Sequence, residues 1–254
     1  MTTVARIALQ PFSYAIAVAT FFLTILPGSL ISLPFSLERR VAISGPFWKL
    51  CSTIILRIST LSKVYIEDRR PLNEKESAPK GLYIANHQSF VDIPLIISCL
   101  QIPPIMKKEV LYIPILGLCG YASGALIVDR KSAASRRTTL IRAQQRLLKG
   151  LKALQVYPEG TRQKLGDGPK DYSFIKKALL KYAFEKNLPV YPISMYGTKR
   201  VINSKTGFIN HGQKVGIIIK EALRPDLFQS SDEFMENCWN EVHLGYSELQ
   251  EKLT

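Results

Sequence analysis

The sequence predicts an α/β protein with a mixed, largely parallel sheet flanked by helices, preceded by membrane-associated helices at the N-terminus. Three observations support this class. Short β-rich runs alternate with helical patterns from Lys63 onward, several strand candidates are continuously apolar, and no charged side chain occurs between Arg6 and Glu38. Apolar strands joined by crossover helices are typical of parallel sheets that are covered on both faces.

The length favours one large domain with a small additional element. At 254 residues the chain is long enough for a single α/β domain with its own core, and a second full domain is not expected. We therefore expect membrane-anchoring helices over residues 1–62 and an α/β domain over residues 63–254. A polar segment with prolines, residues 68–81, is expected to form a loop near the start of this domain.

The uncharged N-terminal stretch is expected to touch a membrane. A helix that crosses a bilayer needs about 20 apolar residues, whereas Pro11 and Pro27 bracket only fifteen residues. Two arrangements remain open: a kinked helix over residues 7–31 that spans the membrane, or a re-entrant or interfacial hairpin that turns at residues 27–29. A cleaved signal peptide is a third alternative, and the lack of a small-x-small cleavage site after the apolar run argues against it.

Positive charge after the apolar run predicts its orientation. Arg39 and Arg40 follow the run, and basic residues beside a membrane segment tend to stay in the cytoplasm. We therefore expect a membrane protein whose main domain lies on the cytoplasmic side. Residues 45–61 then repeat apolar side chains at helical spacing. This helix either docks on the core or lies among lipid headgroups, where Trp48 and Arg57 would suit the boundary.

The α/β domain is expected to alternate strands and helices. The strand candidates are residues 63–68, 82–86, 125–129, 154–160, 189–195 and 214–223. The helix candidates are residues 93–100, 135–151, 173–186 and 231–252. The helix over 135–151 carries basic side chains on most of its surface, which indicates either a solvated face or attraction to anionic lipid.

The composition indicates an anionic partner. The formal net charge is +14, which leaves nucleic acid, acidic lipid headgroups and phosphorylated substrates as candidates. We expect no nucleic acid, because the aromatic residues lie mostly in apolar runs and do not alternate with basic residues as stacking platforms would. The four cysteines contain no C-x-x-C pair and, with three scattered histidines, form no zinc pattern. No metal is therefore expected.

The stretch "YIANHQSFVD", residues 83–92, holds the strongest candidates for chemistry. A strand ends before residues 86–89 and a helix begins after them, with Pro94 in its first turn. Taken alone, Asp92 is explained as a capping carboxylate and His87 as a buried turn residue. The turn also lets the chain fold back, so that the carboxylate can accept a hydrogen bond from one imidazole nitrogen and leave the other free as a base.

No protein nucleophile accompanies this pair in the sequence. Ser89 is too close to the histidine along the chain, and no G-x-S-x-G elbow occurs anywhere. A hydroxyl group of the substrate, activated directly by His87, is the simpler explanation of the motif.

Three further blocks follow this motif. The four are "NHQSFVD" (86–92), "MKKEVLYIPILGLCGYASGALIVDR" (106–130), "VYPEGTR" (156–162) and "LPVYPISMYGT" (188–198). In this order they resemble the four blocks of the glycerolipid acyltransferase family, and most closely its 1-acylglycerol-3-phosphate acyltransferases. The resemblance covers nearly half of the chain and implies the glycerolipid acyltransferase fold.

The resemblance also implies roles for residues in the first three blocks. It places a catalytic base at His87 and its carboxylate partner at Asp92. Substrate binding is implied at Asn86, Lys107, Arg130, Glu159, Gly160, Thr161 and Arg162. Arg162, after a Gly-Thr turn, can present two donors in one plane to a phosphate dianion. Glu159 would be a poor phosphate ligand, so we expect it to orient Arg162 or a neighbouring lysine.

The implied reaction moves a fatty acyl group from a thioester, acyl-CoA or acyl carrier protein, to the free hydroxyl of 1-acylglycerol 3-phosphate and gives phosphatidic acid. The thioester is a co-substrate and already activated, so no cofactor and no acyl-enzyme are expected. The expected partners are the lysophospholipid acceptor, the thioester donor and membrane lipids. Two alternatives remain: an acyltransferase for another lysophospholipid, a lyso-aminolipid or glycerol 3-phosphate, or a non-catalytic membrane protein that binds lipid.

Overall fold

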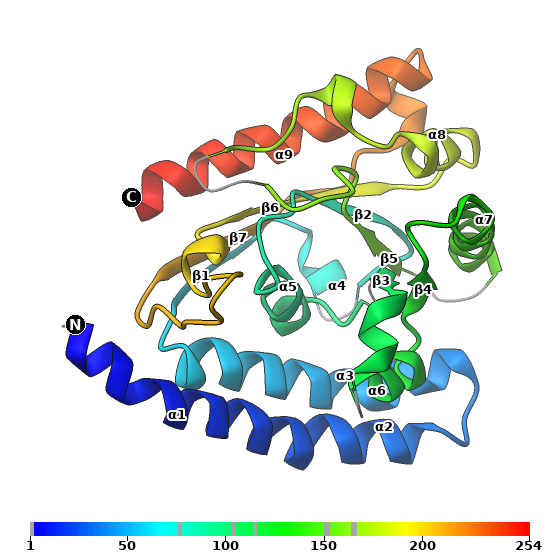
Figure 1. Cartoon of the computed structure of the whole chain (residues 1–254). Coiled ribbons are helices and arrows are strands. Elements are labelled where there is room, and N and C mark those ends of the chain that lie inside the picture. Colours follow the sequence, from blue (N-terminus) through cyan, green and yellow to red (C-terminus); the bar gives the residue numbers. More distant parts are fainter. Residues whose placement is uncertain (1–2, 76–77, 103–104, 114–115, 150–152, 164–166) are drawn as a thin grey trace.

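A five-stranded sheet lies at the centre of the chain in the computed structural model, which describes residues 3–75, 78–102, 105–113, 116–149, 153–163 and 167–254. The long C-terminal helix α9 (Ser231–Leu253) covers one face of the sheet (Figure 1). A hairpin of N-terminal helices lies beyond the other face, and helix α5 (Asp92–Cys99) is sandwiched between the hairpin and the sheet (Figure 1).

The central sheet is mixed and largely parallel, as the sequence predicted. Its strands are β1 (Lys63–Asp68), β2 (Gly81–Ala85), β5 (Ala153–Val156), β6 (Val190–Tyr196) and β7 (Lys214–Ile219). They lie in the order β1-β7-β6-β2-β5. The pairs β1–β7, β2–β6 and β2–β5 are parallel, and β6–β7 is antiparallel.

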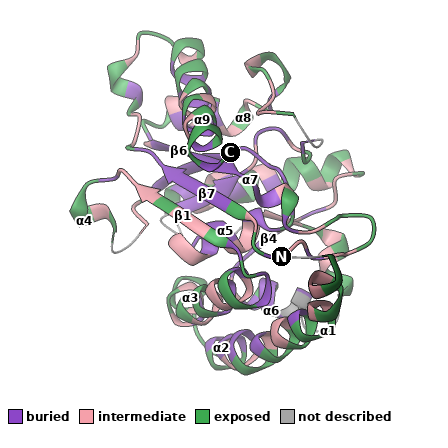
Figure 2. Cartoon of the chain, turned by 90° about the vertical axis from the view of Figure 1, so that its left-hand side faces the viewer, coloured by how far each residue is buried: buried purple, intermediate pink, exposed green. Residues whose placement is uncertain are grey.

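Strand β2 shows how the sequence divides the core between the two faces. All residues of β2 and β6 are buried, and Figure 2 shows the buried strands β6 and β7 between more exposed helices. Leu82 and Ile84 pack in the cluster that contains Trp239 of α9. Tyr83 alternates with them and packs in the cluster that contains Leu95 of α5. This alternation follows from the two-residue repeat of a strand.

A second, two-stranded sheet lies apart from the first. Strands β3 (Ile105–Lys107) and β4 (Leu126–Val128) pair in parallel, and a 3-10 turn (Lys108–Tyr112) and helix α6 (Leu116–Ala122) connect them. The strand predicted at 125–129 is therefore confirmed, but it does not join the central sheet. Strand β3 was not predictable from the sequence, because three residues are too few to show the alternation of side chains that marks a strand.

The remaining helices of the α/β part are short α4 (Leu72–Lys75), α7 (Ala133–Lys149) and α8 (Ala178–Glu185). The predicted end of α7 at 150–151 lies outside the described residues. Helix α8 begins later than the predicted 173, because residues Tyr172–Phe174 form a separate 3-10 turn. Helix α9 begins after Ser230, whose side chain accepts a hydrogen bond from the Glu233 backbone N–H at 3.2 Å, as N-cap residues do.

The first arm of the N-terminal hairpin agrees with the predicted helix over residues 7–31 and not with a turn at residues 27–29. Helix α1 (Thr3–Thr20) continues through a π-helical turn (Phe21–Ile25) into α2 (Leu26–Ser32), so residues 27–29 stay helical. The proline there lies at the start of α2, directly after the π-helical turn. The chain turns instead at residues 33–36 and returns as α3 (Leu37–Ile54), which ends in a second π-helical turn (Ile55–Ser59).

Both arms of this hairpin are long and apolar enough to cross a membrane, by length and composition. The stretch Thr3–Ser32 has 30 residues and a mean hydropathy of 2.0, and Leu37–Ser59 has 23 residues and a mean hydropathy of 1.3. Large apolar side chains on the first arm are exposed, among them Val4, Ile7, Phe12, Val18, Leu23 and Leu30. Figure 2 shows exposed positions along α1.

Candidate active site

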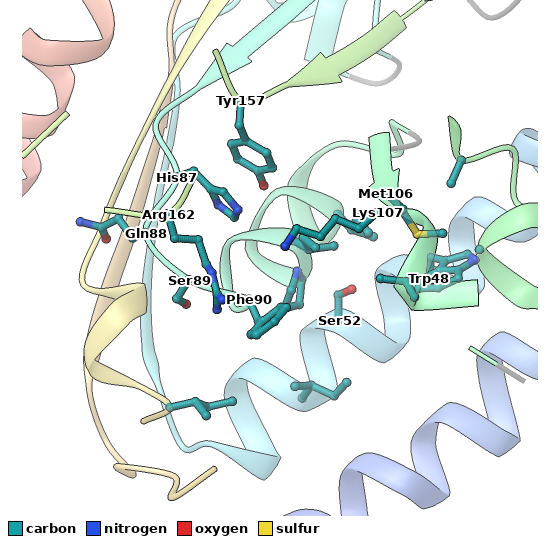
Figure 3. Close-up of a pocket in the computed structure, with 18 of the residues that line it drawn as sticks. Trp48, Ser52, His87, Gln88, Ser89, Phe90, Met106, Lys107, Tyr157 and Arg162 are labelled. Atoms are coloured by element: carbon teal, nitrogen blue, oxygen red, sulfur yellow. The ribbon is translucent and has the colours of Figure 1, made fainter. Parts of the chain in front are cut away.

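A cavity of about 1720 Å³ opens between the N-terminal hairpin and the α/β part. Its apolar walls include Phe21, Ile25, Trp48, Ile55, Ile97 and Met106. Its polar wall includes His87, Lys107, Arg130, Thr161, Arg162 and Lys199. The cavity therefore combines a long apolar lining with a basic region around one histidine, as Figure 3 shows in close-up.

His87 and Asp92 form the hydrogen bond that the sequence allowed. Strand β2 ends at Ala85, the chain turns, and Asp92 begins helix α5. Nδ1 of His87 lies 2.7 Å from Oδ2 of Asp92. When this nitrogen donates its proton to the carboxylate, Nε2 of the neutral ring is left as a base. The histidine lines the cavity, so a substrate can reach it.

Asp92 is fully buried, and its carboxylate is held by four donors. Besides the histidine ring, Oδ2 accepts hydrogen bonds from the backbone N–H groups of Gln88 at 2.6 Å and Ser89 at 2.8 Å. Oδ1 accepts one from the hydroxyl of Thr198. Donors of this kind stabilise the charged form of a buried carboxylate. The capping explanation and the catalytic explanation thus describe the same side chain, because one carboxylate organises the turn and holds the imidazole.

Glu159 supports the same turn from the third block. It is buried, and Oε2 accepts a hydrogen bond from the backbone N–H of His87 at 2.9 Å. Oε1 accepts from Nε2 of Gln163 at 2.7 Å and from the backbone N–H of Lys170 at 3.0 Å. Burial raises the pKa of Glu159, and these donors oppose that effect. Of the two partners expected for Glu159, Arg162 or a neighbouring lysine, the structure shows the lysine: the carboxylate binds the backbone N–H of Lys170, and no ion pair joins it to Arg162 among the described residues.

Four predicted binding residues surround the cavity. Lys107, Arg130, Thr161 and Arg162 all line it. The guanidinium carbon of Arg162 lies 4.2 Å from the centre of the Phe90 ring, which holds the side chain beside the histidine turn. Nη1 of Arg130 donates to the carbonyl oxygen of Gly160 at 3.0 Å. Burial is the main cause that lowers the pKa of Arg130, and the charge of Arg162 adds to it, as expected where like charges gather.

Gly160 gives this loop its shape. Its φ of +68° lies in the left-handed region, and a Cβ atom there would lie 2.7 Å from Cε of Lys176. Glycine adopts this conformation without strain. Its carbonyl oxygen faces Arg130, and the hydroxyl oxygen of the next residue, Thr161, accepts a hydrogen bond from Nζ of Lys170 at 2.9 Å.

Asn86 does not contact the cavity in the way that the resemblance implied. Its side chain is fully buried, Nδ2 donates to the carbonyl oxygen of Met195 at 2.9 Å, and Oδ1 accepts from the Met195 N–H at 2.7 Å. Both ends of the amide are therefore used by the backbone of β6. The prediction of a substrate contact is corrected to a structural role: Asn86 ties the start of the histidine turn to the neighbouring strand.

Sequence reasoning missed two residues next to the catalytic candidates. Thr198, which binds Asp92, lies in the fourth block, but no local pattern shows a contact so distant in sequence. The ring of Tyr157 stacks on the ring of His87, with centroids 4.0 Å apart and planes 17° from parallel. Tyr157 lies in the third block, directly before Pro158. Among the described residues, no three His, Cys, Asp or Glu side chains are grouped to hold a metal ion.

The fold and this site define a class of protein. The family model described as Acyltransferase matches residues 63–196, more than half of the chain. The chain therefore belongs to the acyltransferase family, and the resemblance of its four blocks is confirmed.

The chain is also similar in sequence to individual acyltransferases. The 1-acyl-sn-glycerol-3-phosphate acyltransferase of Salmonella typhimurium is 28% identical over 171 residues, which cover 66% of this chain and 65% of that protein. The enzyme of the same name from Saccharomyces cerevisiae is 28% identical over 191 residues, covering 71% of this chain and 62% of that protein. The matched region thus spans a little less than two thirds of either relative.

A solved structure extends the similarity to the whole chain. The crystal structure of the 1-acyl-sn-glycerophosphate (LPA) acyltransferase PlsC from Thermotoga maritima superposes with a TM-score of 0.77 at 26% sequence identity. The superposition covers 98% of both chains, so it includes the N-terminal hairpin as well as the sheet.

Proposed function

We propose that this protein is an O-acyltransferase that moves a fatty acyl group from acyl-CoA or acyl carrier protein to the free hydroxyl of 1-acylglycerol 3-phosphate, and so makes phosphatidic acid for phospholipid biosynthesis. The main support is the placement of the His87–Asp92 pair in the wall of a cavity that also holds Arg162. The names of the relatives point to the same acceptor.

In the proposed mechanism, Nε2 of His87 takes the proton of the acceptor hydroxyl while its oxygen attacks the thioester carbonyl carbon. The tetrahedral intermediate then collapses, the C–S bond breaks, and the leaving thiolate receives the proton from the imidazolium. Asp92 stabilises the imidazolium and fixes the ring through Nδ1. General base catalysis of this kind contributes about 10²- to 10⁴-fold in rate.

Binding of the acceptor phosphate is proposed for Arg162, Lys107 and Arg130. All three line the same cavity as His87, and the described residues place no acidic partner on Arg162. An arginine can bind two phosphate oxygens at once, and such charge-assisted hydrogen bonds are stronger than neutral ones. Thr161 adds a hydroxyl at the same edge. Glu159 and Asn86 support the site from behind and are not proposed to touch the substrate.

The apolar part of the cavity suits the fatty chains. Pockets for small ligands usually measure roughly 300–1,000 Å³, and this cavity of about 1720 Å³ is larger. Two long-chain substrates that react with each other need this space. Much of the apolar wall comes from the N-terminal hairpin, through Phe21, Ile25, Trp48 and Ile55.

We also propose that residues 1–62 anchor the protein to a membrane and that residues 63–254 form the catalytic domain on the cytoplasmic side. The two apolar arms of the hairpin and their exposed side chains support the anchor. The formal net charge of +14 supports the cytoplasmic side, because the anionic lipid headgroups that attract basic side chains lie on the cytoplasmic face of the membrane. The acceptor and product are both lipids, so an anchored enzyme meets them within the bilayer.

The test is an acyl-transfer assay with the purified full-length protein in mixed micelles. A panel of lysolipids and glycerol 3-phosphate is offered with acyl-CoA and with acyl carrier protein, and the products are identified by mass spectrometry. We expect phosphatidic acid from 1-acylglycerol 3-phosphate, and no product with the His87→Ala variant. A strict requirement for an acceptor without phosphate would overturn the proposed acceptor. Lipid binding without transfer to any acceptor would favour a non-catalytic protein.

A further inference from the structure

A buried tyrosine hydroxyl beside the proposed base has no role in the mechanism so far. Tyr157 follows directly after β5, and its ring lies against the face of the His87 ring. Both side chains line the cavity, and Figure 3 shows the Tyr157 hydroxyl directed toward the space that the His87 ring faces. The stacking fixes the plane of the phenol, so the hydroxyl has a defined position next to the reacting groups.

This hydroxyl is buried without a hydrogen bond. Oη of Tyr157 has no partner among the described residues, and neither has Nε2 of Gln155. Gln155 lies two positions earlier and therefore on the same face of the chain. A buried polar group without a partner destabilises a protein, so each one in a native structure calls for an explanation. A ligand atom in the cavity would supply the missing partner for Tyr157.

The chemistry of the hydroxyl restricts its role to that of a donor. Burial, and after it the negative charge of Asp92, raises the pKa of Tyr157 well above its ordinary value. The phenol therefore keeps its proton at neutral pH. The parallel stacking also directs the two rings face to face, so the hydroxyl does not compete with Asp92 for Nδ1.

We propose that Tyr157 is a catalytic residue whose hydroxyl donates a hydrogen bond to the carbonyl oxygen of the acyl thioester. This inference rests on the proposed acyl transfer. As the acceptor oxygen forms its bond to the carbonyl carbon, the electron pair of the C=O bond moves to the carbonyl oxygen, and the donor stabilises the resulting oxyanion. The tyrosine proton is not transferred: the acceptor proton goes to His87 and then to the thiolate, and the carbonyl re-forms when the C–S bond breaks.

Gln155 is proposed as the positioning residue behind this donor. Its amide lies close enough to Tyr157 to lower the pKa of the phenol somewhat, against the larger effect of burial. When Nε2 of Gln155 donates to the phenol oxygen, the proton of Tyr157 is left to point into the cavity. The unpartnered atoms Gln155 Nε2 and Tyr157 Oη then become members of one chain that ends on the substrate.

The test is Tyr157→Phe, which removes the oxygen and keeps the ring that stacks on His87. We expect kcat to fall about 10- to 100-fold, because a single oxyanion donor contributes effects of this order or larger. The KM values of acceptor and donor are expected to change less than about threefold, since the bond strengthens mainly in the transition state. The midpoint of thermal unfolding is expected to change by only a few degrees, because the hydroxyl has no hydrogen bond in the structure and the proposed bond from Gln155 would be its single contact with the protein.

Tyr172→Phe is the matched control. The Tyr172 hydroxyl is also buried without a partner in the described part of the chain, but its ring packs against the α9 side of the core and under the ammonium group of Lys177. We expect wild-type kcat for this variant. Gln155→Leu is expected to lower kcat in the same direction as Tyr157→Phe but less.

The possible outcomes separate this inference from the proposed function. A Tyr157→Phe variant with wild-type kcat, or with a loss that Tyr172→Phe shares, overturns the role of Tyr157 and leaves the acyl transfer intact. A variant that unfolds at a markedly lower temperature also overturns it, because the hydroxyl would then serve the packing of the protein and its loss could lower kcat without any contact to the substrate. If the wild-type protein transfers no acyl group to any acceptor, the proposed function itself fails.

Discussion

The hydroxyl of Thr198 donates a hydrogen bond to Oδ1 of Asp92 from a position 106 residues later in the chain. Thr198 follows Gly197, whose φ of 83° turns the chain at the end of β6. The other carboxylate oxygen of Asp92 accepts the bond from His87. The orientation of the proposed catalytic pair therefore depends on the central sheet as well as on the turn that contains it.

Replacing Thr198 should weaken catalysis without removing any group that touches the substrate. Thr198→Val keeps the shape of the side chain but leaves Oδ1 of Asp92 with one donor fewer. We expect kcat to fall about tenfold, in line with the loss of a hydrogen bond to a charged group. Thr198→Ser should restore most of the activity, because it returns the hydroxyl. Steady-state kinetics of the wild type, Thr198→Val and Thr198→Ser measure this effect. Equal kcat values for all three proteins would show that the hydrogen bond from Thr198 to Asp92 does not support catalysis.

The charge pattern around the cavity leads to a prediction about the acceptor. Arg162→Ala should lower kcat/KM for 1-acylglycerol 3-phosphate by about tenfold or more, because a charge-assisted pair of hydrogen bonds to phosphate is lost. Arg162→Lys should recover only part of this, since an ammonium group lacks the planar pair of donors. The control is the uncharged monoacylglycerol. A loss of the same size with that acceptor would remove Arg162 from phosphate recognition.

Glu159 offers a test of the support behind the histidine. Its carboxylate accepts from three donors, and in Glu159→Gln one oxygen becomes an NH₂ group that faces an N–H donor. We expect a loss of about 1–3 kcal/mol in the free energy of unfolding, the usual cost of an unsatisfied buried donor, together with a lower kcat. Glu221→Gln, at an exposed position, is the control. Chemical denaturation measures the free energy of unfolding, and kinetics measure kcat. If neither value changes in Glu159→Gln, the hydrogen bonds that the Glu159 carboxylate accepts do not support the histidine turn.

Features that depend on residues close together in the sequence were predicted correctly. The strands, the long helix α9 and the bond between His87 and Asp92 follow from periodicity and from two residues five positions apart. The partners of Glu159 and Asn86 were not predictable, because those contacts join residues 72 and 109 positions apart. A residue's type shows which hydrogen bonds it can make but not which distant atom it meets. Asn86 was consequently placed with the substrate instead of with β6.

Of the two arrangements that the sequence left open for the N-terminal stretch, the turn at residues 27–29 is wrong, and for a different reason. Proline and glycine at 27–28 are the usual signals of a turn, yet the chain stays helical there. Gly28 instead permits close packing, because a Cβ atom would lie 2.5 Å from Cγ of Phe47 on α3. Tertiary packing thus decided the conformation at a position where local preference indicates a break.

The contact between Ser13 and His211 predicts how pH affects the docking of helix α1. Oγ of Ser13 lies 2.6 Å from Nε2 of His211, which is buried in the loop between β6 and β7. Nδ1 of His211 has no partner among the described residues. Burial, and after it the positive charge of Arg6 on the same helix, lowers the pKa of His211 below its ordinary value of 6.5.

A histidine whose pKa is lowered on folding binds its proton more weakly in the native state than in the unfolded state. Its stabilising contribution is therefore complete above the unfolded pKa and is lost as the pH falls through the native pKa. We expect the wild-type protein to lose stability between pH 7.5 and 5.5, and His211→Gln, which has no ring to titrate, to lose less. Thermal unfolding at both pH values measures the difference, with His243→Gln as the control. An equal drop in wild type and His211→Gln would show that His211 does not couple helix α1 to pH.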